Sequence, residues 1–180
     1  SDLSTLLHLI GCVDLPTSGR VWIDGVEVGR LGDRERTGLR ANQIGFVFQF
    51  HHLIPVLTAR ENIEFPLRIG GMSRGGARRR AAELLDAVGL QAEADRRPAR
   101  MSGGQCQRVA VARALAAHPG LVVADEPTAN LDSDTGRRIV ELMQEMAGRS
   151  GTAFVVATHD PEVAACASVR HRLHDGRVVA

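Results

Sequence analysis

Short apolar runs that alternate with helical patterns constrain the fold of this chain most. Runs rich in Val, Ile or Phe, bounded by polar residues or glycine as buried strands are, cover residues 20–24, 44–48, 121–125 and 152–157. Between them, apolar residues recur at helical spacing over residues 5–10, 73–88, 102–117 and 134–147. Strands that alternate with helices predict an α/β domain with a mostly parallel sheet.

The middle of the chain, residues 50–108, has helical periodicity and little strand signal. We therefore predict one domain, with a core formed by residues 1–49 and 109–180 and a helical subdomain inserted at 50–108. Residues 171–180 predict a small hairpin that turns at Asp175-Gly176. No apolar run approaches the roughly 18 residues that span a bilayer, so we predict no direct membrane insertion.

Two adjacent carboxylates end one predicted strand: Leu121-Val-Val-Ala is followed by Asp125 and Glu126. Ligands of open α/β sheets bind at the carboxyl ends of the strands. One carboxylate at such a place can hold Mg²⁺, often through water, and the next can orient or deprotonate an attacking water. The alternative is a strand followed by an ordinary acidic turn.

Other polar residues stand at the ends of predicted elements. Gln49 directly follows the strand 44–48, and Thr158-His159-Asp160 follows the strand 152–157. Ser102-Gly103-Gly104-Gln105 begins a predicted helix, where backbone N–H groups can approach an anion closely. Each of these features also has a structural interpretation, as a capped glycine-rich turn or as a single polar residue at a strand end.

Taken in order, these segments resemble the ATP-binding subunits of ABC transporters over essentially the whole chain. MSGGQCQRVAVARAL is similar to the family's signature helix, LVVADEPTANLD to the Walker B strand and D-loop, FVFQ to the Q-loop, and ATHD to the switch histidine. The stretch GFVFQFHHLIPVLTARENIEFPL further resembles the lipoprotein-releasing and macrolide-exporter subfamily. The resemblance implies a P-loop NTPase (RecA-like) α/β core with an inserted helical signalling subdomain.

The resemblance also implies roles within one subunit. Ser4 and Asp125 would hold Mg²⁺, with Gln49 as a further metal ligand that senses the γ-phosphate and signals to the permease. Glu126 would be the general base, and His159 would position the γ-phosphate and the attacking water.

Further roles concern the bound nucleotide and a second subunit. Thr5 would contact phosphate within one subunit. The residues implied to meet ATP bound by the opposite subunit, or to lie at that interface, are Ser102, Gly103, Gly104, Gln105 and Asp132.

The implied cofactors are ATP and Mg²⁺, and the implied partners are a second copy or a paired ATPase subunit and an integral membrane permease. The subunit would sit at the cytoplasmic face of the inner membrane, held there through the permease. A net charge of +1 gives no reason to expect nucleic acid as a partner. The three widely spaced cysteines fit a reducing compartment.

The chain departs from the family at the phosphate loop, which ends in Gly-Lys-Ser-Thr. Ser4-Thr5 matches that ending, so Asp2 and Leu3 stand at the Gly and Lys positions. All 22 residues counted as Lys or Arg are arginine, so no lysine is available elsewhere. The loop's backbone N–H groups and lysine hold the β- and γ-phosphates, so we expect impaired ATP hydrolysis.

Two explanations of this departure stay open. The chain is an ordinary subunit truncated through its Walker A loop, or it is a degenerate, non-hydrolysing partner whose signature segment completes a site on an intact subunit. A non-transport ABC ATPase is a further alternative. Those proteins usually carry tandem cassettes or long coiled-coil insertions, which 180 residues do not contain.

Overall fold

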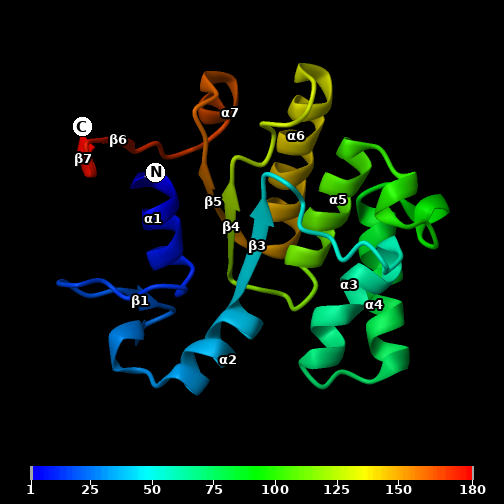
Figure 1. The fold of residues 1–180 in the computed structure, drawn as a ribbon, viewed down its shortest axis with the longest axis horizontal. Helices are drawn as coiled ribbons and strands as arrows, with labels where there is room; N and C mark the ends of the chain where they lie inside the picture. Colours follow the sequence, from blue (N-terminus) through cyan, green and yellow to red (C-terminus); the bar gives the residue numbers. More distant parts are fainter. Residues whose placement is uncertain (1, 180) are drawn as a thin grey trace.

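The fold is described from a computed structural model, which describes residues 2–179 (Figure 1). Its centre is a parallel sheet in the order β3-β4-β5, formed by Ile44–Phe48, Leu121–Asp125 and Ala153–Ala157. The register places Phe48 opposite Asp125 and Asp125 opposite Ala157, so the three strands end level with one another. The predicted mostly parallel sheet is confirmed.

Helices surround this sheet in the described part of the chain. The α-helices are α1 (Asp2–Ile10), α2 (Asp33–Gln43), α3 (Ala59–Ile69), α4 (Arg74–Ala87), α5 (Gly103–Ala114), α6 (Ser133–Ser150) and α7 (Pro161–Ala165). Short 3₁₀ turns are η1 (Val28–Arg30), η2 (Gln91–Glu93) and η3 (Pro98–Arg100). In Figure 1, α1 lies on one side of the sheet, and α5 and α6 lie on the other.

The two faces of the sheet contribute to two separate apolar clusters, because side chains alternate along a strand. Val47 and Val122 belong to the larger cluster, which also takes in buried residues of α3, α4, α5 and α6. Val123 and Ala157 belong to a smaller cluster with Leu7 of α1. Asp125 is two residues beyond Val123 and therefore projects toward the α1 face.

The predicted helical middle consists of α3 and α4, which pack against each other and against α5 (Figure 1). Thr58 caps α3 by accepting from the Glu61 N–H, and Ser73 caps α4 by accepting from the Gly76 N–H. The predicted boundary at residue 108 lies within α5, and the division of the chain into a core and a helical subdomain stays a prediction.

The prediction that residues 20–24 form a buried strand of the main sheet is wrong. Residues Trp22–Ile23 form β1, which pairs antiparallel with β2 (Val26–Glu27) as a separate hairpin. Asp24 and Gly25 turn the chain with φ values of 48° and 76°, as a tight two-residue hairpin requires. Trp22 is half-exposed, and the guanidinium carbon of Arg20 lies 5.2 Å from its ring centroid.

The remaining elements differ less from the prediction. The first helix begins at Asp2 instead of residue 5, and α2, which has no buried residue, was not predicted. The C-terminal hairpin is confirmed as β6 (Arg172–His174) and β7 (Arg177–Val179), which turn at Asp175-Gly176. Among residues 2–179, no helix combines the length and apolar character needed to cross a membrane.

Candidate functional site

The level ends of β3, β4 and β5 bring polar residues from distant parts of the chain to one edge of the sheet. Ser4 of α1 donates its hydroxyl to Oδ2 of Asp125 at 3.3 Å. Both side chains are half-buried, and both offer the oxygen ligands that Mg²⁺ prefers. These two of the predicted metal-binding residues therefore lie close together and fit a magnesium ion.

Glu126 and His159 form the second contact of this edge. Oε1 of Glu126 accepts from the His159 N–H at 3.0 Å and lies 2.6 Å from its Nδ1. Oε2 lies 3.4 Å from the Thr158 hydroxyl. The predicted base and the predicted switch histidine are thus in direct contact.

Glu126 has a left-handed backbone conformation, with φ of 46°. Such a conformation is unfavourable for a residue with a side chain and persists where the surroundings hold it. Here the Glu126 N–H donates to the Ala157 carbonyl at 2.9 Å, which ties the residue to the end of β5. The strain is therefore located at the residue that the motif predicts to be the general base.

The Glu126 carboxylate raises the pKa of His159 above its ordinary value, first by accepting a hydrogen bond from the ring and then through its charge. The ring itself is largely exposed, so water competes for this contact. The protonated imidazole is the form that the carboxylate favours.

Gln49 follows β3 directly, and its backbone carbonyl accepts from the Asn130 side chain at 3.1 Å. Asn130 belongs to the segment that resembles the D-loop, but sequence reasoning assigned it no role. A polar side chain in an exposed loop carried no signal that could have singled it out.

Gln107 is a second residue that sequence reasoning missed. It is fully buried in α5 and donates from Nε2 to the Pro127 carbonyl at 2.7 Å. A polar residue at a buried helical position was the available signal, but it can be noticed only when the buried face of α5 is known.

The predicted dimer-facing residues make local contacts in this chain. Ser102 accepts from the Gln105 N–H at 3.2 Å, and the Ser102 N–H donates to Gln105 Oε1 at 2.9 Å, which is a capping box. Asp132 caps α6 by accepting from the Thr135 N–H at 3.0 Å. A hydrogen bond from the Thr135 side chain, and then the bond from this N–H, lower the pKa of the Asp132 carboxyl. The role of these residues toward a second subunit stays a prediction.

Gly103 and Gly104 form the first turn of α5, against the start of α6. A Cβ placed on Gly104 would lie 2.4 Å from Cγ2 of Thr135, and one on Gly103 would lie 3.4 Å from Leu131. Gly104 therefore has a packing role besides any role in binding phosphate.

The segment that matches the end of the phosphate loop lies at the start of α1. Leu3 is half-buried and packs against the smaller apolar cluster, so it supplies no charge at the position where the family has lysine. Thr5 is exposed. The side chain of Asp2, predicted at the Gly position, lies outside what the structure describes.

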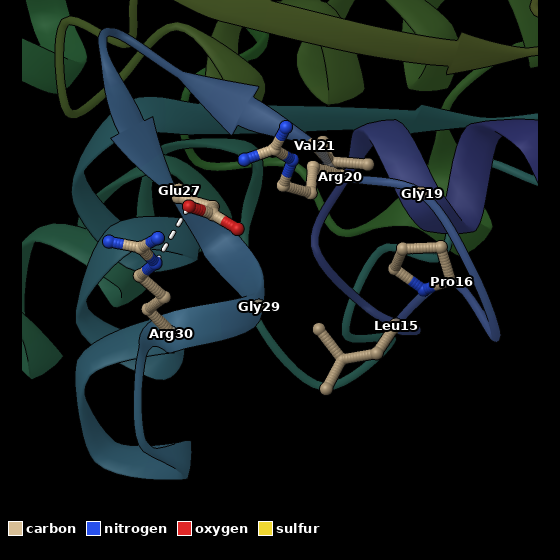
Figure 2. A pocket seen from close by; sticks show the side chains of 8 residues that line it. All are labelled: Leu15, Pro16, Gly19, Arg20, Val21, Glu27, Gly29 and Arg30. Atoms are coloured by element: carbon tan, nitrogen blue, oxygen red, sulfur yellow. Dashed lines mark ion pairs between the residues drawn. The ribbon is translucent and has the colours of Figure 1, made fainter.

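The described part of the chain has one cavity beside α1 and another beside the first hairpin. The larger, of about 780 Å³, runs along β5 between α1, α6 and α7, and Thr158 lines one part of it. The smaller, of about 270 Å³, lies beside the hairpin, where Nε of Arg30 pairs with Oε2 of Glu27 at 2.8 Å (Figure 2). None of the predicted site residues is among the described residues that line the smaller cavity.

Comparison with known proteins identifies the family. The profile described as ABC transporter matches residues 3–129. The lipoprotein-releasing system ATP-binding protein LolD of Bordetella pertussis is 46% identical over 178 residues, which cover 99% of this chain and 77% of that protein. An uncharacterised ABC transporter ATP-binding protein of Thermotoga maritima is 48% identical over 178 residues, covering 99% of this chain and 76% of that one.

A solved structure gives the same result for the fold. The dimeric ATP-binding cassette MJ0796, in a post-hydrolysis state bound to ADP and Pi, superposes with a TM-score of 0.79 at 47% identity. The match covers 91% of this chain and 72% of that one, and it confirms the predicted α/β P-loop NTPase fold. The chain therefore belongs to the ABC transporter family, as one of its ATP-binding subunits.

Proposed function

We propose that this subunit hydrolyses ATP to drive a separate membrane permease of the lipoprotein-releasing type, at the cytoplasmic face of the inner membrane. The observation that carries the proposal is that, at one edge of the sheet, Ser4 donates to Asp125 and His159 contacts the Glu126 carboxylate. The relatives named LolD support the lipoprotein-releasing assignment.

The side chains at this edge suit hydrolysis of a phosphoanhydride. Ser4 and Asp125 would hold Mg²⁺, with Gln49 as a further ligand, and the ion supplies positive charge that offsets the phosphate oxygens. Glu126 accepts the proton of the attacking water, whose oxygen displaces ADP from the γ-phosphorus and leaves as part of inorganic phosphate. His159 orients Glu126 and the phosphoryl oxygens around that water.

A second copy of the subunit, or a paired one, would complete the nucleotide site. The dimeric form of the MJ0796 cassette supports this arrangement. The first turn of α5 presents backbone N–H groups that have no intrahelical acceptor, and such a turn suits a phosphate. We assign that role to Ser102, Gly103, Gly104 and Gln105, with Asp132 at the interface, and a phosphate contact within the subunit to Thr5.

Residues 50–108 would form the signalling subdomain that meets the permease. Four large apolar side chains of this segment are exposed: Phe50, Val56, Phe65 and Ile69, by 66%, 68%, 45% and 70%. A membrane protein that covers them would remove this apolar area from water.

ATP turnover tests the proposal, measured with the chain extended by a strand and loop that end in Gly-Lys before Ser4 and assembled with a permease of the lipoprotein-releasing type. We expect turnover that rises when the permease is present and falls by about a hundredfold or more in Glu126→Gln, which keeps the shape but loses the base. Turnover equal in wild type and Glu126→Gln would contradict the assignment of Glu126. Turnover with no response to any such permease would contradict the assignment of the partner.

We further propose that these 180 residues, assayed by themselves, hydrolyse ATP poorly, because Leu3 stands at the lysine position and the sequence contains no lysine. A matched pair of extended chains provides the test: one preceded by a strand and loop that end in Gly-Lys before Ser4, the other ending in Gly-Leu. We expect at least about tenfold higher turnover with Gly-Lys, since a lost phosphate contact of roughly 2 kcal/mol costs more than tenfold. Equal turnover in both chains would overturn this account.

A further inference from the structure

Gln107 makes polar contacts at both ends of its amide although its side chain is fully buried. Its Nε2 lies 2.7 Å from the Pro127 carbonyl and 3.4 Å from the Phe48 carbonyl, and its Oε1 lies 2.5 Å from Nδ1 of His51. Since carbonyl oxygens only accept, the amide nitrogen must face them and the amide oxygen must face the ring. Nδ1 of His51 therefore carries the hydrogen.

The partners of Gln107 flank the two residues on which hydrolysis depends. Phe48 directly precedes Gln49, and Pro127 directly follows Glu126. One side chain of α5 is thus tied to the main chain beside the γ-phosphate sensor and beside the general base. Asn130, in the loop after β4, provides a second link, because its side chain donates to the Gln49 carbonyl at 3.1 Å.

The turn after Gln49 is strained and is held by the same helix. His51 and His52 have φ values of 58° and 46°, in the left-handed region that is unfavourable for residues with a side chain. Arg113 of α5 donates to their carbonyls at 2.8 and 2.7 Å. Several hydrogen bonds therefore hold the segment from Phe48 to His52 against α5.

We propose that Gln107 is a positioning residue, which fixes Gln49 relative to Glu126 by fastening the end of β3 and the loop after β4 to one point of α5. This inference rests on the proposed ATP hydrolysis. A displacement of about 1 Å in a reacting group can cost a hundredfold in rate, so one buried bond and two partly buried bonds beside two such groups suffice for a large effect.

The test compares Gln107→Met with Val109→Ala in the chain extended by a strand and loop that end in Gly-Lys before Ser4, assembled with its permease. Met has nearly the volume of Gln but cannot bond Pro127, Phe48 or His51. Val109 is equally buried in the same helix and makes only apolar contacts, so Val109→Ala is a matched control for lost stability. We expect Gln107→Met to lower kcat by about ten- to a hundredfold with KM for ATP within about twofold, and Val109→Ala to leave both within about twofold.

A third variant separates the bond between Gln107 and His51 from the two bonds that Gln107 makes with carbonyl groups. His51→Phe removes the ring bond but leaves Gln107 bonded to both carbonyls, so we expect a smaller loss of kcat than in Gln107→Met. If Gln107→Met does not fold, Gln107→Asn carries the test, because it keeps the amide but withdraws it by one methylene.

The outcomes are distinguishable from those that bear on the proposed function. No turnover by the wild-type assembly would count against the proposed function itself. Wild-type turnover with kcat unchanged in Gln107→Met, or lowered equally in Val109→Ala, would overturn the positioning role. An increase in KM with kcat unchanged would also overturn it, because it would place Gln107 in nucleotide binding instead.

Discussion

At the scale of single residues, the two oxygens of the Glu126 carboxylate have unequal surroundings. Oε1 receives both contacts from His159, whereas Oε2 has a 3.4 Å contact with the Thr158 hydroxyl. A carboxylate offers about four lone-pair sites, so Oε2 keeps the capacity to accept a proton from water. The contact with His159 therefore orients the Glu126 carboxylate without occupying it fully.

The titration of His159 is the first prediction. We expect its pKa to lie above 6.5 and to return toward that value in Glu126→Gln, because the raised pKa depends first on the Glu126 carboxylate. The ring signals can be followed by NMR as the pH is raised, with His159→Asn to assign them among the seven histidines.

The sign of the linked stability follows from the same shift. Because the pKa is higher in the folded chain than in the unfolded one, the contact stabilises the fold fully below the unfolded value and is lost as the pH rises through the folded value. A His159 pKa that is identical in wild type and Glu126→Gln would show that the contact does not persist in solution.

At the scale of elements, the close approach of α5 to α6 predicts the effect of a single methyl group. Gly104→Ala would place a Cβ 2.4 Å from Cγ2 of Thr135, so we expect a loss of about 1–3 kcal/mol in the free energy of unfolding. Thr135→Ala removes the obstructing methyl, and we expect the double variant to recover much of the loss. Urea unfolding of the two single variants and the double variant measures this coupling.

Gly45→Ala is the matched comparison for that pair. There a Cβ would lie 2.2 Å from the backbone carbonyl oxygen of Ala114, which no side-chain truncation can remove. We expect a larger loss than in Gly104→Ala. If Thr135→Ala failed to rescue Gly104→Ala, the packing explanation for that glycine would be wrong.

Asn62 of α3 fixes the segment that leads from the Gln49 turn into the helical middle. It is fully buried, accepts from the Ile54 N–H at 2.7 Å, and donates to carbonyls that include Ile54 at 3.2 Å and Thr58 at 2.9 Å. Asn62→Leu leaves those groups without their partner, and we expect a loss of about 2–4 kcal/mol by urea unfolding. Asn42→Leu, at an exposed position of α2, is the control and should change stability by less than about 0.5 kcal/mol.

The elements also show how far sequence reasoning reaches. The strands β3 and β4 were predictable because most residues of their apolar runs are buried, and β5 because its run is apolar although it is only partly buried. Ser102 marked the start of α5 as a cap. The run at residues 20–24 was misassigned because the Asp24-Gly25 turn signal, which closes it into a hairpin, was given no weight. Helix α2 has no buried residue, so it leaves no apolar period to detect.

The residues of the candidate site likewise fall into those that local motifs predict and those that only the three-dimensional structure identifies. Local motifs predict Ser4, Asp125, Glu126 and His159 as site residues. The structure brings them together in pairs, and their catalytic and metal-binding roles stay predictions. Asn130 and Gln107 act through contacts with residues 81 and 59 positions away in the chain, at Gln49 and Phe48. Contacts over that distance depend on the sheet order, which no local pattern specifies.

At the scale of the whole molecule, the sheet separates two apolar clusters of unequal size. Val122 is completely buried in the larger cluster, and its neighbour Val123 is 3% exposed in the smaller one, whose Leu7 and Ala157 line the 780 Å³ cavity. We expect Val122→Ala to cost about 2 kcal/mol and Val123→Ala about 1 kcal/mol, because surroundings that are less densely packed relax more easily. Urea unfolding of the two variants compares the faces directly, and an equal or reversed order would contradict this picture of the core.

The hairpin of β1 and β2 gives the chain a built-in optical probe. Trp22 is the single tryptophan and there is no tyrosine, so emission excited near 295 nm or at 280 nm arises from one ring in one hairpin. Because that ring is half-exposed beneath the Arg20 guanidinium, its emission should be red-shifted and open to quenching by iodide, whose approach the cation favours. A spectral change on adding nucleotide would therefore report a response of the hairpin itself, without background from the rest of the molecule.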